Sequence, residues 1–75
     1  MGKSGESPGL SPSERSVLYH AAEGKTNQYI SSVLGISKRT VEKHLERVYK
    51  KLGVETRTAA VIFFFNHKDL VSAAL

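Results

Sequence analysis

A group of long charged side chains between residues 39 and 50 has the types and spacing needed to recognise bases in a DNA groove. Arg39, Lys43 and Arg47 recur every four residues, so a helix would place them on one side together with Glu46 and Lys50. Guanidinium and ammonium groups donate hydrogen bonds to guanine, whereas a carboxylate accepts from the amino group of cytosine. The chemistry offered is base recognition, although such a basic side is also typical of a helix that is simply solvated.

The segment from Ser37 to Gly53 reads as the one complete helix that would carry these side chains. Ser37 is the expected N-cap, Gly53 offers a left-handed stop, and Lys50 and Lys51 oppose the negative end of the helix dipole. Its apolar residues recur at spacings of four, three and four: Val41, Leu45, Val48 and Leu52. This narrow apolar stripe is expected to face a core and to leave the charged side outward.

Length and composition limit what else the chain can do. Its 75 residues allow one small domain of three or four helices and leave little room for a deep catalytic cleft. Eleven Lys and Arg against seven Asp and Glu give a net charge of +4, which favours a polyanionic partner such as nucleic acid or an anionic membrane. The absence of cysteine removes disulfides, thiol catalysis and Cys-based zinc sites, and fits a cytoplasmic protein. The longest apolar run, residues 59–65, is too short to span a bilayer, so we expect a soluble domain.

Cap residues predict where the first helix begins and ends. Residues 1–9 are rich in Gly and Ser and are expected to be a disordered linker or a remnant of cloning, so the domain should cover residues 10–67. Ser11, Pro12 and Glu14 form a capping-box start for a helix to about Glu23, with Gly24 as its stop. The expected buried side of this helix is Val17, Leu18, Ala21 and Ala22.

A short second helix is expected between Thr26, its N-cap, and Gly35, its stop. Ile30, Val33 and Leu34 occupy the i, i+3 and i+4 positions and are expected in the core. Only Gly35 and Ile36 separate the end of this helix from the next cap, Ser37. Two helices joined by a short glycine-containing turn, the second basic on its outer side, form a helix-turn-helix arrangement, although an ordinary helical hairpin has the same spacing.

The fourth helix is expected from Arg57, after the Thr56 cap, to about His67. Residues 59–65 are apolar on every side, so one helix of a small domain cannot bury them all. The core set is Ala60, Val61 and Phe64, and the set left for a partner is Ala59, Ile62, Phe63 and Phe65. The simplest partner is the same helix of a second copy. The alternative is that residues 70–75, in a C-terminal tail (68–75) that could be helical, fold back over these rings.

Several of these motifs together resemble the LuxR-type, or GerE-like, helix-turn-helix domain of bacterial transcription regulators. The similarity spans about Leu10 to His67 and includes Leu34-Gly35-Ile36-Ser37 and Lys51-Leu52-Gly53-Val54. The other matching stretches are residues 10–15, 22–24, 26–27, 40–41 and 57–61, with Ile30 and His44. The resemblance implies an all-α, four-helix bundle-like domain with its third helix in the major groove and its fourth helix at a dimer contact. Such domains usually follow a sensor part, which residues 1–9 could not provide, so we expect an effector domain or a regulator without a sensor.

A DNA complex of this kind would divide the contacts between bases and phosphates. The expected base contacts are Arg39, Lys43, Glu46 and Arg47. The expected phosphate contacts are Thr26, Asn27, Ser37, Lys38, Thr40, Lys50 and Lys51. The expected partners are double-stranded DNA with inverted half-sites, a second copy of the chain and, as a further candidate, RNA polymerase. No cofactor, metal or membrane partner is expected.

Three positions depart from the family pattern or leave their role open. Glu42 and Glu46 stand where many members carry basic or amide side chains. Glu42 is expected to pair within the helix with Lys38 or Arg39, whereas Glu46 either pairs with Lys43 or Lys50 or accepts from cytosine. Tyr29 stands where the family often has Glu, so its hydroxyl is a candidate phosphate contact. His44 lies at the edge of the apolar stripe and is expected to be a partly buried structural histidine.

An enzyme is not expected from this chain. His20, His44 and His67 lie on different expected helices without metal-ligand spacing, and neither a phosphate-binding glycine loop nor a recognisable Ser-His-acid arrangement occurs. The alternative function is a helical module that recruits a protein through its aromatic helix and uses the basic side only for solubility. Salt-dependent binding to duplex DNA would separate the two hypotheses.

Overall fold

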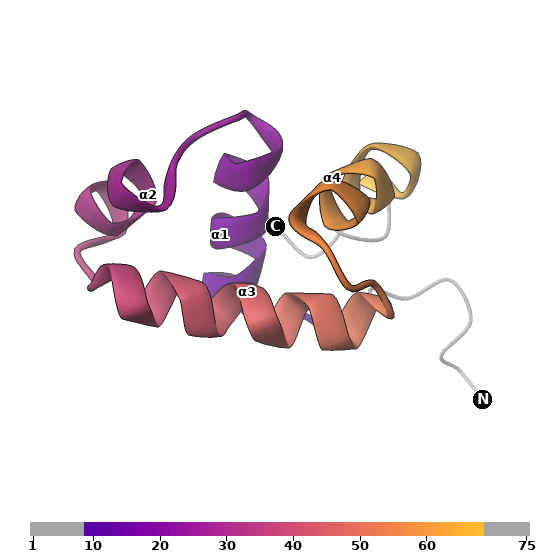
Figure 1. Cartoon of the computed structure of the whole chain (residues 1–75), viewed down its shortest axis with the longest axis horizontal. Coiled ribbons are helices and arrows are strands. Elements are labelled where there is room, and N and C mark those ends of the chain that lie inside the picture. The colour runs from indigo at the N-terminus through magenta and orange to yellow at the C-terminus, as the bar shows by residue number, and fades with distance from the viewer. Residues whose placement is uncertain (1–8, 69–75) are drawn as a thin grey trace.

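The computed structural model describes residues 9–68, and this part of the chain consists of four α-helices and their connections. The helices are α1 (Pro12–Ala22), α2 (Asn27–Leu34), α3 (Lys38–Leu52) and α4 (Arg57–Asn66), as Figure 1 shows. The predicted all-α class is therefore confirmed. The expectations for residues 1–8 and 69–75, including the tail that would cover the phenylalanine rings, lie outside the described residues. Within residues 9–68 no helix is long and apolar enough to cross a membrane.

Side chains at the helix starts fix where each helix begins. The Ser11 hydroxyl accepts from the Glu14 N–H at 3.1 Å, and the Glu14 carboxylate accepts from the Ser11 N–H at 2.9 Å. The capping box is therefore present as predicted. The hydroxyls of Thr26, Ser37 and Thr56 cap the other three helices in the same way, each accepting the N–H three residues later. Short-range bonds from a side-chain hydroxyl thus define all four helix starts.

A glycine ends each of the helices α2 and α3. Gly35 and Gly53 adopt φ values of 70° and 74°, in the left-handed region that side chains disfavour. Gly35 turns the chain from α2 to the Ser37 cap within two residues. This confirms the predicted helix-turn-helix connection between α2 and α3.

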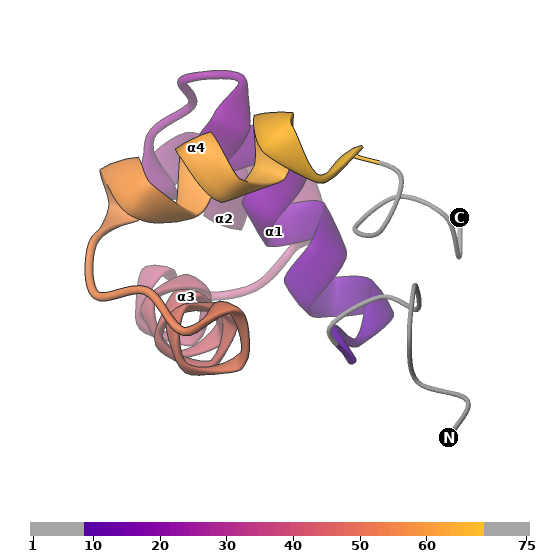
Figure 2. The same cartoon turned by 90° about the vertical axis from the view of Figure 1, so that its right-hand side faces the viewer.

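The third helix lies along one edge of the molecule. It packs against α1, α2 and α4, and α1 also packs against both α2 and α4. In Figure 1, α2 and α4 lie above α3 and α1 passes behind it; Figure 2 shows α3 nearly end-on, with α2 and α4 above it and α1 beside it. One long side of α3 therefore remains uncovered by the described part of the chain.

The apolar stripe of α3 supplies both halves of the core. One cluster joins α1, α3 and α4 and consists of Leu10, Leu18, Val48, Leu52, Ala60 and Phe64. The other joins α1, α2 and α3 and consists of Val17, Ala21, Ile30, Val41 and Leu45. All four predicted stripe residues of α3 are buried. Burial of this face therefore orients α3, because turning the helix would expose the stripe.

The burial predictions for α2 and α4 need correction. Val33 was expected in the core but is 52% exposed, so that prediction is wrong. The short α2 packs through Ile30 and Leu34, and Ile36, just after the helix, also packs against the second core cluster. Val61, expected in the core, is only partly buried. Phe63, expected to face a partner, packs partly against the first cluster.

Candidate nucleic-acid interface

The uncovered side of α3 carries the long polar side chains that were predicted to lie there. Its exposed residues are Arg39, Glu42, Lys43, Glu46, Arg47 and Lys50. The buried stripe of Val41, Leu45, Val48 and Leu52 fixes their direction, because it turns the opposite side of the helix to solvent. The structure therefore brings all four predicted base-contact residues, Arg39, Lys43, Glu46 and Arg47, onto one accessible surface. A single α-helix exposed along its length fits the width of the DNA major groove.

The N-termini of α2 and α3 provide hydrogen-bond donors beside this surface. The first N–H groups of a helix have no partner within the helix, and they carry partial positive charge. Thr26 caps one N–H of α2 at 3.1 Å, and Ser37 caps one N–H of α3 at 3.0 Å. The hydroxyls of Ser37 and Thr40 also lie 2.9 Å apart at the start of α3. The N–H groups of the first two residues of each helix remain available to an anion such as phosphate.

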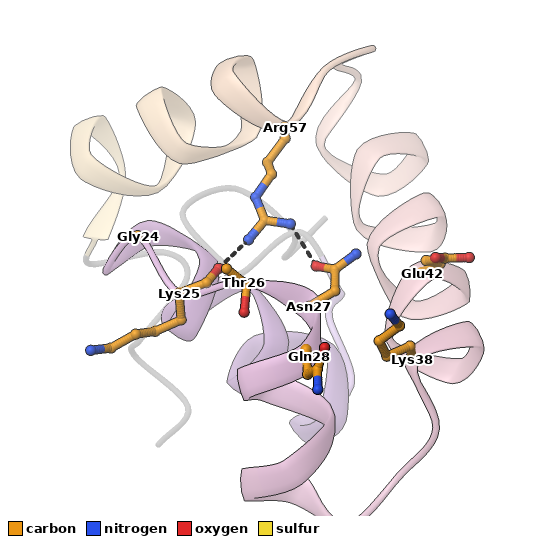
Figure 3. Close-up of a pocket in the computed structure, with 8 residues that line it drawn as sticks. All are labelled: Gly24, Lys25, Thr26, Asn27, Gln28, Lys38, Glu42 and Arg57. Carbon is orange, nitrogen blue, oxygen red and sulfur yellow. Dashed lines mark hydrogen bonds between the residues drawn. The ribbon is translucent and has the colours of Figure 1, made fainter.

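A surface hollow lies between the starts of α2, α3 and α4 (Figure 3). Its volume is about 710 Å³, and its lining residues are Gly24, Lys25, Thr26, Asn27, Gln28, Lys38, Glu42 and Arg57. Three of the predicted phosphate contacts, Thr26, Asn27 and Lys38, therefore face the same space. Glu42 lines it too, so the hollow combines basic and acidic groups.

Arg57 lines this hollow from α4, although no role was predicted for its side chain from the sequence. Its Nη1 donates to Asn27 Oδ1 at 2.6 Å, and its Nη2 donates to the Lys25 carbonyl at 2.5 Å. The first position of α4 is a poor place for a cation, because the N-terminal end of the helix dipole is already positive. This unfavourable position of a cation is a feature of the sequence that indicates an acceptor for Arg57 elsewhere in the fold.

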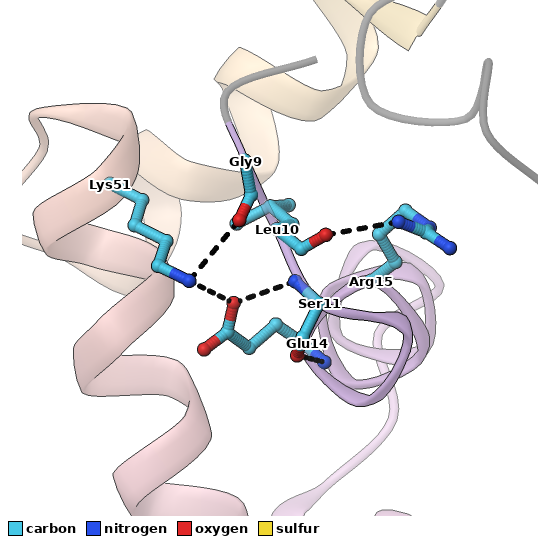
Figure 4. Close-up of polar contacts among 6 residues, drawn as sticks. All are labelled: Gly9, Leu10, Ser11, Glu14, Arg15 and Lys51. Atoms are coloured by element: carbon cyan, nitrogen blue, oxygen red, sulfur yellow. Dashed lines mark hydrogen bonds and ion pairs between the residues drawn. The ribbon is translucent and has the colours of Figure 1, made fainter.

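Lys51 was predicted to contact phosphate, but its ammonium is occupied inside the fold (Figure 4). It lies 2.8 Å from Glu14 Oε1 and donates to the Gly9 carbonyl at 3.2 Å. Burial by itself would raise the pKa of the Glu14 carboxyl, but hydrogen bonds from Lys51 and Ser11 and the Lys51 charge lower it overall. We therefore assign Lys51 to the packing of α1 on α3 and leave it out of the proposed DNA contacts.

The two acidic residues of α3 stand without the expected intrahelical partners. Among residues 9–68, no ion pair within 4 Å involves Glu42 or Glu46. Both also line a smaller hollow of about 300 Å³ that includes Asn27, Tyr49 and Arg57. Their carboxylates therefore lie along the edge of α3 nearest α2 and α4. Their position leaves both free to affect DNA binding directly.

Tyr29 and His44 lie in different surroundings. Tyr29 is 45% exposed, and the Lys25 ammonium lies 5.0 Å from the centre of its ring, so the hydroxyl stays a candidate phosphate contact. His44 is partly buried as predicted, beside the start of α1 and the end of α2. Its Nδ1 is buried without a hydrogen-bond partner in the described chain. Residues 9–68 contain no group of three or more His, Asp or Glu placed to hold a metal ion.

Comparisons with known proteins agree with this geometry. The family model for bacterial regulatory proteins of the luxR family matches residues 8–64. The chain is 41% identical over 59 residues to the nitrate/nitrite response regulator protein NarP of Escherichia coli strain K12, covering 79% of this chain and 27% of NarP. It is 42% identical over 59 residues to the transcriptional activator protein BjaR1 of Bradyrhizobium diazoefficiens, covering 79% of this chain and 24% of BjaR1.

A third relative gives the same picture. The transcriptional activator protein YukR of Yersinia ruckeri is 46% identical over 52 residues, which is 69% of this chain and 23% of YukR. The chain thus spans about a quarter of the length of each of these relatives. The region matched by the family model, residues 8–64, contains α1, α2, α3 with its exposed side, and all but the last two residues of α4. The chain therefore belongs to the luxR family of bacterial regulatory proteins and contains the helix-turn-helix DNA-binding domain of that family.

Proposed function

We propose that this chain binds double-stranded DNA in a sequence-dependent manner, as the effector domain of a bacterial transcription regulator, with α3 in the major groove. The observation that carries the proposal is the uncovered side of α3, where Arg39, Lys43 and Arg47 lie exposed beside the starts of α2 and α3. A rigid helix held by its buried stripe can present these donors to base edges without reorganisation. The capped helix starts supply donors to the flanking phosphates.

The proposed contacts follow the two kinds of group on this surface. Base contacts are assigned to Arg39, Lys43, Glu46 and Arg47. Phosphate contacts are assigned to Thr26, Asn27, Ser37, Lys38, Thr40 and Lys50. Glu46 would accept from the amino group of cytosine and repel bases that present only acceptors, so it would give specificity by exclusion.

The proposed dimer contact lies on α4. Ile62 and Phe65 are 55% and 53% exposed, although both are large apolar side chains. Ala59 and Phe63 are partly buried, so they would form the inner edge of the contact. In Figure 1, α4 lies on the opposite side of α3 from its uncovered surface, so a second copy could bind there without blocking DNA. A two-fold pair would read inverted half-sites about one helical turn apart.

The longer relatives indicate the context of the domain. NarP is described as a response regulator, and BjaR1 as a transcriptional activator. We infer that the present domain acts in the bacterial cytoplasm, where the genome is, within a regulator that controls transcription. RNA polymerase is a further candidate partner for such a regulator.

Selection from a random duplex library, followed by salt titration on the selected site, tests the proposal. We expect a recovered motif with two inverted half-sites and a logarithmic salt slope of about −0.9 for each phosphate neutralised. Protein shown to be folded that enriches no sequence and binds no duplex would contradict the proposal. Strong self-association without DNA affinity would instead support a protein-interaction module that uses the exposed Ile62 and Phe65.

A further inference from the structure

We propose that Arg57 is a positioning residue for DNA binding: from α4, it orients the side-chain amide of Asn27 so that Nδ2 donates to a DNA phosphate. This inference rests on the proposed function and assigns the phosphate contact of Asn27 to a single atom. It also extends the DNA-binding machinery to α4, which lies away from the uncovered side of α3.

The orientation follows from the chemistry of the guanidinium group. Arginine only donates hydrogen bonds, so the Asn27 atom that lies 2.6 Å from Arg57 Nη1 must be the amide oxygen. The amide nitrogen then faces the other way. Figure 3 shows it directed toward the side of the hollow formed by Lys38 and Glu42. Without Arg57, rotation of the amide by 180° would present the oxygen to a phosphate, and two acceptors repel each other.

The second bond of Arg57 makes this orientation rigid. Nη2 donates to the Lys25 carbonyl at 2.5 Å, so the planar guanidinium spans the backbone before α2 and the first side chain of α2. A flexible ammonium cannot hold two acceptors in this fixed geometry. Both Arg57 and Asn27 are partly buried, which shields the bonds between them from competing water.

The Nδ2 donor of Asn27 matters because both basic and acidic side chains line the hollow. Lys38 attracts phosphate, whereas the Glu42 carboxylate on the same wall repels it. The backbone N–H groups at the start of α2 are fixed donors, and the oriented Nδ2 adds side-chain donation beside them. One correctly oriented amide therefore contributes a directional contact that the net charge of the hollow does not supply.

A double-mutant cycle on the 75-residue chain tests this inference. Affinity for the selected duplex is measured by fluorescence anisotropy for Arg57→Ala, Asn27→Ala and the double variant. Each single variant should bind about tenfold more weakly, the effect of one hydrogen bond to a charged group at a solvated interface. The double variant should lie within about twofold of Asn27→Ala, because Arg57 acts through Asn27.

Losses that multiply to about a hundredfold would overturn the inference, because Arg57 would then act independently of Asn27. It would also be overturned if Arg57→Ala or Asn27→Ala left affinity within about twofold of the unmodified chain. Arg15→Ala is the matched control, since the guanidinium of Arg15, on α1, also donates to a backbone carbonyl, from its Nη1 to that of Leu10. This control removes the same charge and should change affinity by less than about threefold.

A second variant keeps the test valid if Arg57→Ala unfolds. Asn27→Asp retains an acceptor for Arg57, so the domain should remain folded by circular dichroism, but it presents only oxygen to phosphate. We expect affinity at least as low as that of Asn27→Ala, and affinity equal to that of the unmodified chain would overturn the inference. If the unmodified chain binds no duplex, the proposed function itself fails. If the unmodified chain binds the selected duplex, the affinities of the variants decide only whether Arg57 acts through Asn27.

Discussion

Replacing Lys51 by methionine should destabilise the domain, because it leaves the carboxylate of Glu14 buried without its ammonium partner. Glu14 is only 3% exposed, and Lys51 lies 2.8 Å from its Oε1. Removing one member of a fully buried ion pair costs about 3–5 kcal/mol. The Lys51 side chain is 38% exposed, so water will replace part of the interaction, and the Ser11 N–H still donates to the carboxylate. We therefore expect a loss of about 1–3 kcal/mol in the free energy of unfolding.

Urea unfolding at pH 7, followed by circular dichroism, measures this loss directly. The neighbouring Lys50→Met is the matched control, since Lys50 is exposed and about 100° away around the same helix. It should change the free energy of unfolding by no more than about 0.5 kcal/mol. If Lys51→Met were also within this limit, the assignment of Lys51 to helix packing would be refuted.

Acid should reduce the difference between Lys51→Met and the unmodified chain. The pKa of Glu14 in the folded chain is lowered from its usual value of 4.5, so the unfolded chain binds this proton more tightly. Stability contributed by this group is therefore present above about pH 4.5 and is lost as pH falls through the folded-state pKa. A destabilisation by Lys51→Met that stayed constant from pH 7 to pH 3 would contradict this linkage.

DNA binding should respond to these two lysines in the opposite order. Lys50→Met removes a proposed phosphate contact, so the salt slope should become shallower by about 0.9. Lys51→Met, measured where it remains folded, should leave the slope unchanged because its ammonium already binds Glu14. Equal changes in slope for both variants would restore Lys51 as a phosphate contact.

Three further changes test the base contacts, the acidic edge of α3 and the dimer contact. Lys43→Ala should weaken binding to the preferred site by about 1–3 kcal/mol and flatten preference at one base position, whereas equal losses on all sequences would indicate a phosphate contact. Glu42→Gln should tighten binding by about 0.5–1 kcal/mol by removing a carboxylate from the phosphate-facing hollow, and weaker binding in the same anisotropy assay would contradict this. Ile62→Glu should give a folded monomer in sedimentation equilibrium, with Thr58→Glu, exposed on the same helix, as control; an unchanged oligomeric state would exclude Ile62 from the contact.

The helix limits could be predicted from sequence because they depend on residues three or four positions apart. Each cap is a hydroxyl that accepts an N–H three residues later, and the N–H groups of Gly35 and Gly53 donate to carbonyls three or four residues earlier. The outward side of α3 was predictable for the same reason. An apolar stripe at helical spacing determines which side is buried, whatever packs against it.

Contacts between distant helices could not be predicted in this way. Glu14 and Lys51 are 37 positions apart, and Asn27 and Arg57 are 30 apart. Their pairing depends on how α1 and α3, and α2 and α4, cross in space, which no local pattern specifies. Val33 shows the same limit for burial: its helical position fits a core residue, but the partner helices reach only the Ile30 side of α2.

The basic residues of this domain therefore divide into two groups that composition cannot distinguish. Lys50 and Lys51 are identical neighbours, yet one points to solvent and the other binds a buried carboxylate of α1. Arg57 likewise binds α2 instead of projecting from α4 as a free cation. Because these groups already have partners, neither adds a free charge that can neutralise a phosphate. The strength of DNA attraction should thus follow the exposed cations around α3 and not the net charge of +4, part of which holds the helices in the orientation that exposes α3.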